Sequence, residues 1–192
     1  MTETPNDRPP PGEAAPARGC PVCRAAADWW PLLVPPAVMA GVYAVEAAGL
    51  GVLASKPVHE VIALVLLSAA TGVAGLRWLR RRRPEHGVLT VVCAVFLLRE
   101  VHVPVPGWKE GFYVAVGLIG LWCVGWRRRL WPVVVGQTRG RWLVATTWAY
   151  LLALLVQRRA LKFLPHEADI HIQLEEVGEN LAHLFLLILG LL

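Results

Sequence analysis

Four polar side chains share one face of the last apolar segment of the chain, residues 174–192. At spacings of i, i+3, i+4 and i+7, which fall on one side of a helix, the segment carries Glu176, Glu179, Asn180 and His183. Ionisable side chains within a bilayer are costly, so they usually face a partner, a cavity or a site. Carboxylates and imidazoles together are ligands for zinc and iron, and Glu179 and His183 lie one helical turn apart. This face therefore predicts a binding site for a divalent metal ion, either zinc or iron.

The composition of the chain indicates a membrane protein. Of its 192 residues, 56% are hydrophobic and only 17% are charged. A soluble domain of this size cannot bury that much apolar surface. The net charge of +5 comes from arginines clustered between apolar runs, which is a signal for membrane orientation. We therefore expect the lipid bilayer as the main partner and no nucleic acid.

Six apolar stretches can position the polar residues. They cover about residues 29–53, 58–79, 88–103, 108–126, 142–164 and 174–192. As helices, these stretches fit the roughly 30 Å apolar slab of a bilayer, the third only just. The predicted fold class is all-α: a polytopic membrane bundle of about six transmembrane helices, formed by residues 29–192.

Residues 1–28 form a polar, proline-rich tail that is expected to be disordered. The tail contains one C-x-x-C motif, Cys20 and Cys23, which supplies half of a tetrahedral zinc site or a redox pair. The motif is either a reduced surface pair or a metal site shared with a second copy of the chain or with a partner protein. A homo-oligomer and a membrane complex therefore both stay open.

The arginine clusters predict the orientation of the bundle. One cluster, Arg80–Arg83, follows the second stretch, and another, with Arg127–Arg129, follows the fourth. Because cytoplasmic loops are enriched in Lys and Arg, both termini are predicted to be cytoplasmic, in a bacterial inner membrane. The clusters are expected to contact anionic lipids. A third basic group, Arg158, Arg159 and Lys162, lies at the opposite end and departs from this rule.

This topology brings further ionisable residues to the outer end of the bundle, where they could join the polar face of the last segment. The predicted metal ligands are Glu46, Glu60, Glu100, His102, Glu176, Glu179 and His183, with His59 supporting them. A metal ion there could serve a hydrolase or a redox reaction. The sequence fixes neither a substrate nor whether the protein is an enzyme.

Two other uses of the same residues stay open. In the first, arginines neutralise the carboxylates in a structural ion-pair network, with Arg99, Arg158 and Arg159 facing Glu60, Glu100, Glu176 and Glu179. In the second, the cluster belongs to a proton- or ion-coupled transporter. The inner halves of the predicted helices are almost entirely apolar, which argues against a complete path through one copy.

Overall fold

A computed structural model describes residues 29–49, 55–101, 108–128 and 138–192, and all regular elements in these ranges are helical. A short 3₁₀ turn, η1 (Trp30–Leu32), precedes the first α-helix. The α-helices are α2 (Val34–Ala47), α3 (Lys56–Arg81), α4 (Pro84–Glu100), α5 (Trp108–Gly125), α7 (Thr138–Gln157) and α8 (Glu167–Leu191). The all-α prediction is confirmed. The predicted tail, with Cys20 and Cys23, lies outside the described residues.

Prolines mark where several of these helices begin. Pro35, Pro57 and Pro84 each occupy one of the first two positions of a helix. The missing N–H of proline costs little there, because the first turn has no backbone acceptor for it. Helix α3 ends where Arg82 adopts a left-handed backbone conformation with φ of 51°. The chain then turns back at once into α4.

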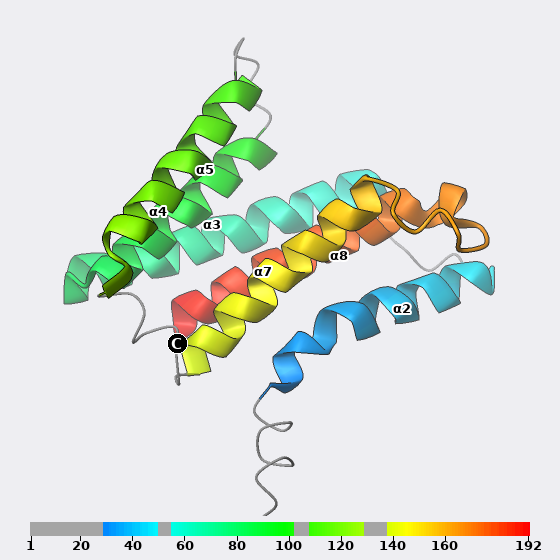
Figure 1. Cartoon of the computed structure of the whole chain (residues 1–192), viewed down its shortest axis with the longest axis horizontal. Coiled ribbons are helices and arrows are strands. Elements are labelled where there is room, and N and C mark those ends of the chain that lie inside the picture. Colours follow the sequence, from blue (N-terminus) through cyan, green and yellow to red (C-terminus); the bar gives the residue numbers. More distant parts are fainter. Residues whose placement is uncertain (1–28, 50–54, 102–107, 129–137) are drawn as a thin grey trace, which may run out of the picture.

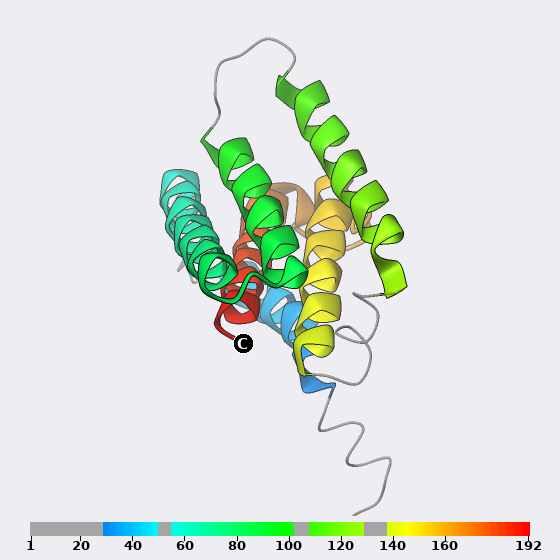
Figure 2. The same ribbon diagram turned by 90° about the vertical axis from the view of Figure 1, so that its left-hand side faces the viewer.

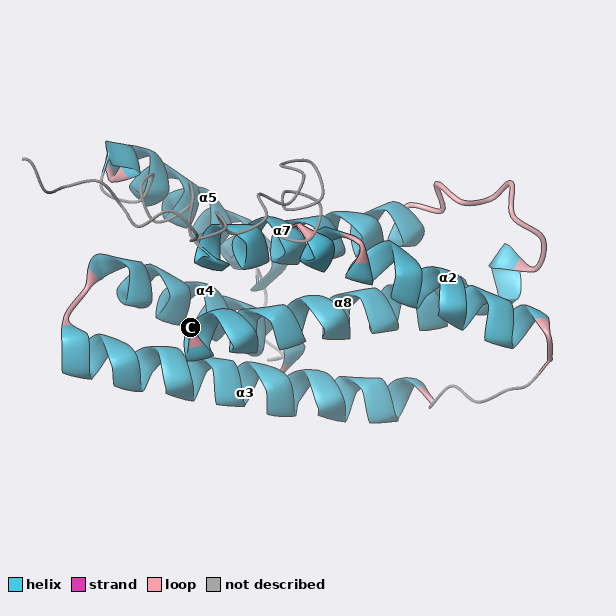
Figure 3. Cartoon of the chain, turned by 90° about the horizontal axis from the view of Figure 1, so that it is seen from below, coloured by secondary structure: helices cyan, strands magenta, loops and turns pink. Residues whose placement is uncertain are grey.

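Helix α8 lies at the centre of the bundle. It packs against α3 on one side and α7 on the other, with further contacts to α2 and α4 (Figure 1). The view from below shows α8 between α3 and α7 (Figure 3). Helix α5 packs against α4 and lies at the edge of the bundle (Figure 2). The segment with the predicted polar face is therefore the helix around which the others gather.

Small residues face inward and large apolar residues face outward on helix α7. Its buried side includes Ala145, Ala149 and Ala153, whereas Leu151 and Leu154 are among its exposed residues. Helix α3 repeats this arrangement, with a buried face that includes four residues spaced by three or four positions, Ala63, Leu67, Ala70 and Ala74, and an exposed face of valines and leucines. Small residues let helices approach closely, and a large exposed apolar surface marks contact with lipid or with a partner.

Two described stretches are long and apolar enough to cross a membrane. These are Trp30–Ala47, with a mean hydropathy of 1.3, and Lys56–Arg81, in which a window of 18 residues has a mean hydropathy of 1.8. The predicted end of the fifth span is wrong, because its helix ends at Gln157 rather than 164. Helices α2 and α4 end at Ala47 and Glu100, and the predicted ends of the first and third spans, residues 53 and 103, lie outside the described residues. The fifth stops early because Arg159 adopts a left-handed conformation with φ of 55°, which a helix cannot continue.

Candidate functional site: the polar cluster around helix α8

The polar face of α8 lies at the end of the bundle where α3 begins and where α4 and α7 end. Three side-chain contacts establish this, since Asn180 reaches His59 on α3, Glu179 reaches Arg99 on α4, and Glu175 reaches Gln157 on α7. We call these residues, together with Glu100, Tyr150 and His183, the α8 cluster. Residues from four helices therefore meet at one end of the bundle.

Arg99 links two of the predicted carboxylate ligands. Its terminal Nη2 donates a hydrogen bond of 2.9 Å to Glu179 Oε1, and its Nε lies 4.0 Å from Glu100 Oε1. The side chains of Arg99, Glu179 and Glu100 are 34%, 17% and 11% exposed. Water screens such a part-buried pair less than a surface pair, and charge-assisted hydrogen bonds are the stronger kind. These contacts are the ones that the ion-pair hypothesis expects of Arg99.

Asn180 fixes the contact between α8 and the first turn of α3. Its amide nitrogen lies 3.2 Å from His59 Nδ1 and donates to the His59 backbone carbonyl at 3.3 Å. Because an amide NH₂ can only donate, the Nδ1 atom of His59 acts as the acceptor in this bond. In the neutral ring the proton then lies on Nε2, which is buried and has no hydrogen-bond partner among the described residues.

His183 is completely buried beside two aromatic rings. Its ring centroid lies 5.7 Å from that of Tyr150 and 6.4 Å from that of Phe96, both in edge-on arrangements. Within the described ranges, neither ring nitrogen of His183 nor the Tyr150 hydroxyl has a hydrogen-bond partner. Each such buried group costs about 1–3 kcal/mol if it stays unpaired. The ring nitrogens of His183 and the hydroxyl of Tyr150 are therefore the atoms of the α8 cluster that could still bind a polar species.

Among the described residues, the other predicted metal ligands do not gather around His183 in one group. Glu60 lies 3.9 Å from Lys56 on its own helix, Glu46 lies in the last turn of α2, and Glu176 is half-buried on α8. His102 lies outside the described residues. In the part of the chain that the structure describes, no group of three or more His, Cys, Asp or Glu side chains could hold a metal ion. The metal site stays a prediction.

Sequence reasoning missed three residues that contact the predicted ones, namely Phe96, Tyr150 and Gln157. Phe96 and Tyr150 stack at 4.6 Å and form one wall beside His183. Gln157 donates to Glu175 at 2.7 Å. The sequence did contain a signal for Tyr150, because a tyrosine inside an apolar run needs a hydrogen-bond partner for its hydroxyl. It contained no such signal for Phe96 and Gln157, whose positions depend on how the helices pack.

The opposite end of α8 is surrounded by positive charge. Arg77 on α3 and Arg139 on α7 donate to the backbone carbonyls of Leu191 and Leu192. Cations near the last carbonyls of a helix are favourable because they oppose the negative end of its dipole. His86 at the start of α4 is buried, and its pKa is lowered from the ordinary value by burial and then by the charge of Arg139.

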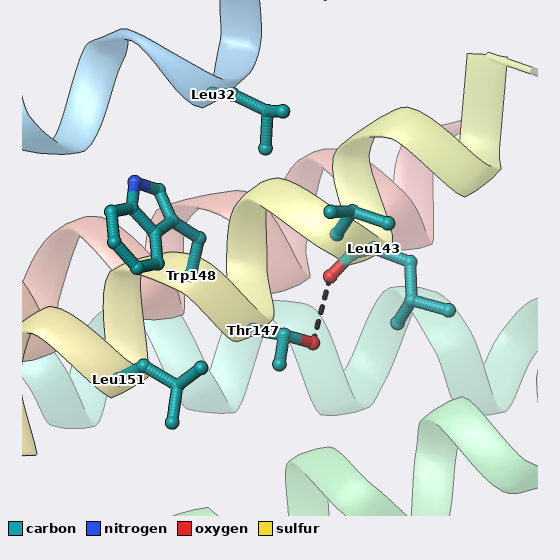
Figure 4. A pocket seen from close by; sticks show the side chains of 6 residues that line it. Leu32, Leu143, Thr147, Trp148 and Leu151 are labelled. Carbon is teal, nitrogen blue, oxygen red and sulfur yellow. Dashed lines mark hydrogen bonds between the residues drawn. The ribbon is translucent and has the colours of Figure 1, made fainter.

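Two pockets that are lined by described residues lie away from the α8 cluster. One is apolar, has a volume of about 420 Å³, and lies between η1 and α7, where Leu32 faces Trp148 and Leu143 (Figure 4). The Thr147 hydroxyl in its lining already donates to the Leu143 carbonyl at 3.0 Å. The other pocket is polar, has a volume of about 540 Å³, and lies where the loop after α7 meets α8.

The chain has been compared with known proteins by sequence and by structure. It matches no protein-family model, no curated protein and no solved structure.

Proposed function

We propose that this chain is a multi-pass protein of a bacterial inner membrane, with six spans and the arginine-rich ends of its helices in the cytoplasm. The support comes from helix packing in addition to hydropathy. Helices α3 and α7 both bury small residues and expose large apolar ones, so α7 resembles α3 in its packing, although of the two only α3 is apolar enough to count as a candidate span. Packing of this kind suits helices whose outer faces meet lipid.

The orientation is tested by labelling single cysteines in intact cells. In a chain in which Cys20, Cys23, Cys93 and Cys123 are replaced, Lys56→Cys and Arg83→Cys each add one exposed thiol at opposite ends of α3. A membrane-impermeant maleimide is expected to label position 56 from outside and position 83 only after lysis. Labelling of both thiols from the same side would overturn the proposed topology.

Within this membrane protein we propose a structural function for the α8 cluster, in a scaffold or a subunit of a membrane complex. The observation that carries this proposal is the 2.9 Å bond between Arg99 and Glu179, which ties α4 to the central helix. The bonds from Asn180 to α3 and from Gln157 to α7 act in the same way. The exposed valines and leucines of α5 offer a surface for lipid or for another subunit.

A second candidate function is favoured by one observation, the unpaired ring nitrogens of buried His183. A zinc or iron ion could use one nitrogen as a ligand, with Glu179 one turn away as a second. Because Arg99 now holds Glu179, binding would require that carboxylate to exchange its arginine for the metal. The cluster would then be a metal centre whose ion-pair form is the metal-free state.

One set of variants separates the two candidates. Metal content is measured on protein purified in detergent, for the wild type, His183→Ala, Glu179→Gln and Arg99→Gln. A metal centre predicts bound metal that disappears in the first two variants and persists in Arg99→Gln, which frees the carboxylate. A structural network predicts no stoichiometric metal in any of them and a lowered unfolding temperature for Arg99→Gln. Bound metal that survives both His183→Ala and Glu179→Gln would remove this cluster as the centre.

A further inference from the structure

The polar pocket after α7 has the lining of an anion site. The loop contributes Arg159, Lys162 and His166 to the lining, and the first turn of α8 contributes Asp169. The lining is completed by Leu164 and Ala168. We propose that this pocket binds a phosphate group, and that the phosphate is the phosphodiester of an anionic lipid headgroup. Arginine and lysine side chains, here with an imidazole beside them, are common donors to phosphate groups in proteins.

The charge of the lining favours a phosphodiester over a dianionic phosphate. Among the described residues of the lining, Arg159 and Lys162 carry positive charges and Asp169 carries a negative one. A lipid phosphodiester carries one negative charge and matches this balance, whereas a dianion would face the Asp169 carboxylate with an unmatched charge.

The loop that forms the pocket is held in place by its own hydrogen bonds. The Tyr43 hydroxyl on α2 donates to the Pro165 carbonyl at 2.9 Å, which ties the loop to a neighbouring helix. Within the loop, the backbone N–H groups of Arg159 and Leu164 donate to the carbonyls of Val156 and Leu161 at 2.7 and 2.9 Å. A pocket that is already ordered binds its ligand without first losing loop entropy.

An exposed aromatic residue next to the pocket suits this part of the chain to a membrane surface. Phe163, next to Lys162, is 77% exposed and points away from the core of the bundle. Phenylalanine together with lysine and arginine is typical of protein segments that lie at the interface between apolar chains and headgroups. Phe163 is therefore suited to enter the apolar layer while Lys162 stays at headgroup depth.

The proposal also explains a departure from the orientation rule. Under the proposed topology, on which this point rests, Arg158, Arg159 and Lys162 lie at the outer end, where basic residues are uncommon. Basic residues that bind a specific anion are retained for that contact, even though they oppose the orientation signal. The two of them that line the pocket, Arg159 and Lys162, are those expected to touch the phosphate.

The test measures lipid retention on the full chain. Protein in detergent is mixed with equal parts of phosphatidylglycerol and phosphatidylcholine, and native mass spectrometry gives the ratio of the two retained lipids. The matched pair is Lys162→Gln, inside the pocket, and Arg158→Gln, which removes the same charge from the same loop outside it. We expect the preference for phosphatidylglycerol to fall about fivefold in Lys162→Gln, since a basic residue at a headgroup contributes about that much. Arg158→Gln and Lys162→Arg are expected to keep the preference.

A second arm distinguishes lipid from free phosphate. The unfolding temperature is measured with and without millimolar inorganic phosphate. If phosphate stabilises the wild type but not Lys162→Gln, and the wild type shows no preference for phosphatidylglycerol, the pocket binds free phosphate and the lipid assignment is overturned. The proposed anion site as a whole is overturned if Lys162→Gln and Arg158→Gln lose the preference for phosphatidylglycerol equally. It is also overturned if the wild type neither prefers phosphatidylglycerol nor is stabilised by phosphate. These outcomes are independent of the cysteine-labelling result, because binding in detergent does not depend on orientation.

Discussion

Arg99 Nη2 and Glu179 Oε1 lie 2.9 Å apart although the two residues are separated by 80 positions in the chain. The bond joins the last turn of α4 to the middle of α8. Arg99 also faces Glu100 at 4.0 Å, so one guanidinium stands between two carboxylates. If this residue is removed, two half-buried carboxylates lose their shared cation.

Replacement of Arg99 by leucine is therefore expected to lower the stability of the bundle. We expect a loss of about 1–3 kcal/mol in the free energy of unfolding, the range for hydrogen bonds to charged groups and for groups left unpaired. Thermal or denaturant unfolding in detergent measures the loss. The cycle of Arg99→Leu, Glu179→Leu and the double variant isolates the pair, and a coupling energy near zero would contradict a structural role for the bond.

Replacement of His183 by leucine is expected to leave stability unchanged or to raise it. The imidazole is completely buried with both ring nitrogens unpaired in the described structure, so an apolar side chain of similar size removes a desolvation cost. The unfolding temperature of the variant is compared with that of the metal-free wild type. A large loss would show that His183 has a polar partner in the folded protein, and the metal candidate would then gain weight.

Replacement of Gly178 by alanine is expected to strain the packing of α7 against α8. A Cβ atom at this position would lie 3.1 Å from Ala153 Cβ and 3.4 Å from Ala153 Cα, so the two helices would have to shift slightly apart. Gly178→Ala should lower stability by about 1–3 kcal/mol through overpacking. Gly72→Ala on α3 is the control, because nothing lies within 4 Å of its Cβ position, and a better helix former should be neutral or stabilising there. Equal effects of the two substitutions would argue against close packing at Gly178.

The stability of the bundle is expected to fall at mildly acidic pH because of His86. Burial and the nearby Arg139 hold the pKa of His86 below its ordinary value of 6.5, so the unfolded chain binds a proton that the folded chain does not. The stabilisation is complete above the ordinary value and is lost as the pH falls from it toward the folded pKa. Unfolding temperatures across this pH range measure the loss. His86→Leu should flatten the profile, and a profile that this substitution leaves unaltered would assign the pH dependence to other groups.

Local patterns account for what the sequence could predict. Apolar periodicity and proline positions indicate helices whatever their neighbours are, so the all-helical class and the polar face of α8 follow from residues close together in the chain. The gathering of polar groups at one end follows from the alternating direction of successive helices. Arg99 was also recognisable as a partner for carboxylates, since it is an arginine inside an apolar run.

The remaining features depend on packing between distant segments. Glu60 was expected to join the cluster, but Lys56 lies one turn before it and is the partner it contacts. Segment 158–164 contains good helix formers, yet the left-handed Arg159 ends α7 before it. Phe96 and Tyr150 become neighbours of His183 only because α4 and α7 pack against α8, which local sequence patterns do not reveal.

The central position of α8 has a consequence for the assembly of the protein in the cell. Among the described helices α8 is the last to leave the ribosome, yet α2, α3, α4 and α7 all contact it. Most of the packing surface of the bundle therefore has no partner while the chain is still being synthesised, because contacts distant in sequence form only after both segments exist. In the proposed membrane protein, α3 and α7 would wait with their alanine-containing faces unpaired, and insertion of α8 would be the step that commits the nascent chain to its native arrangement.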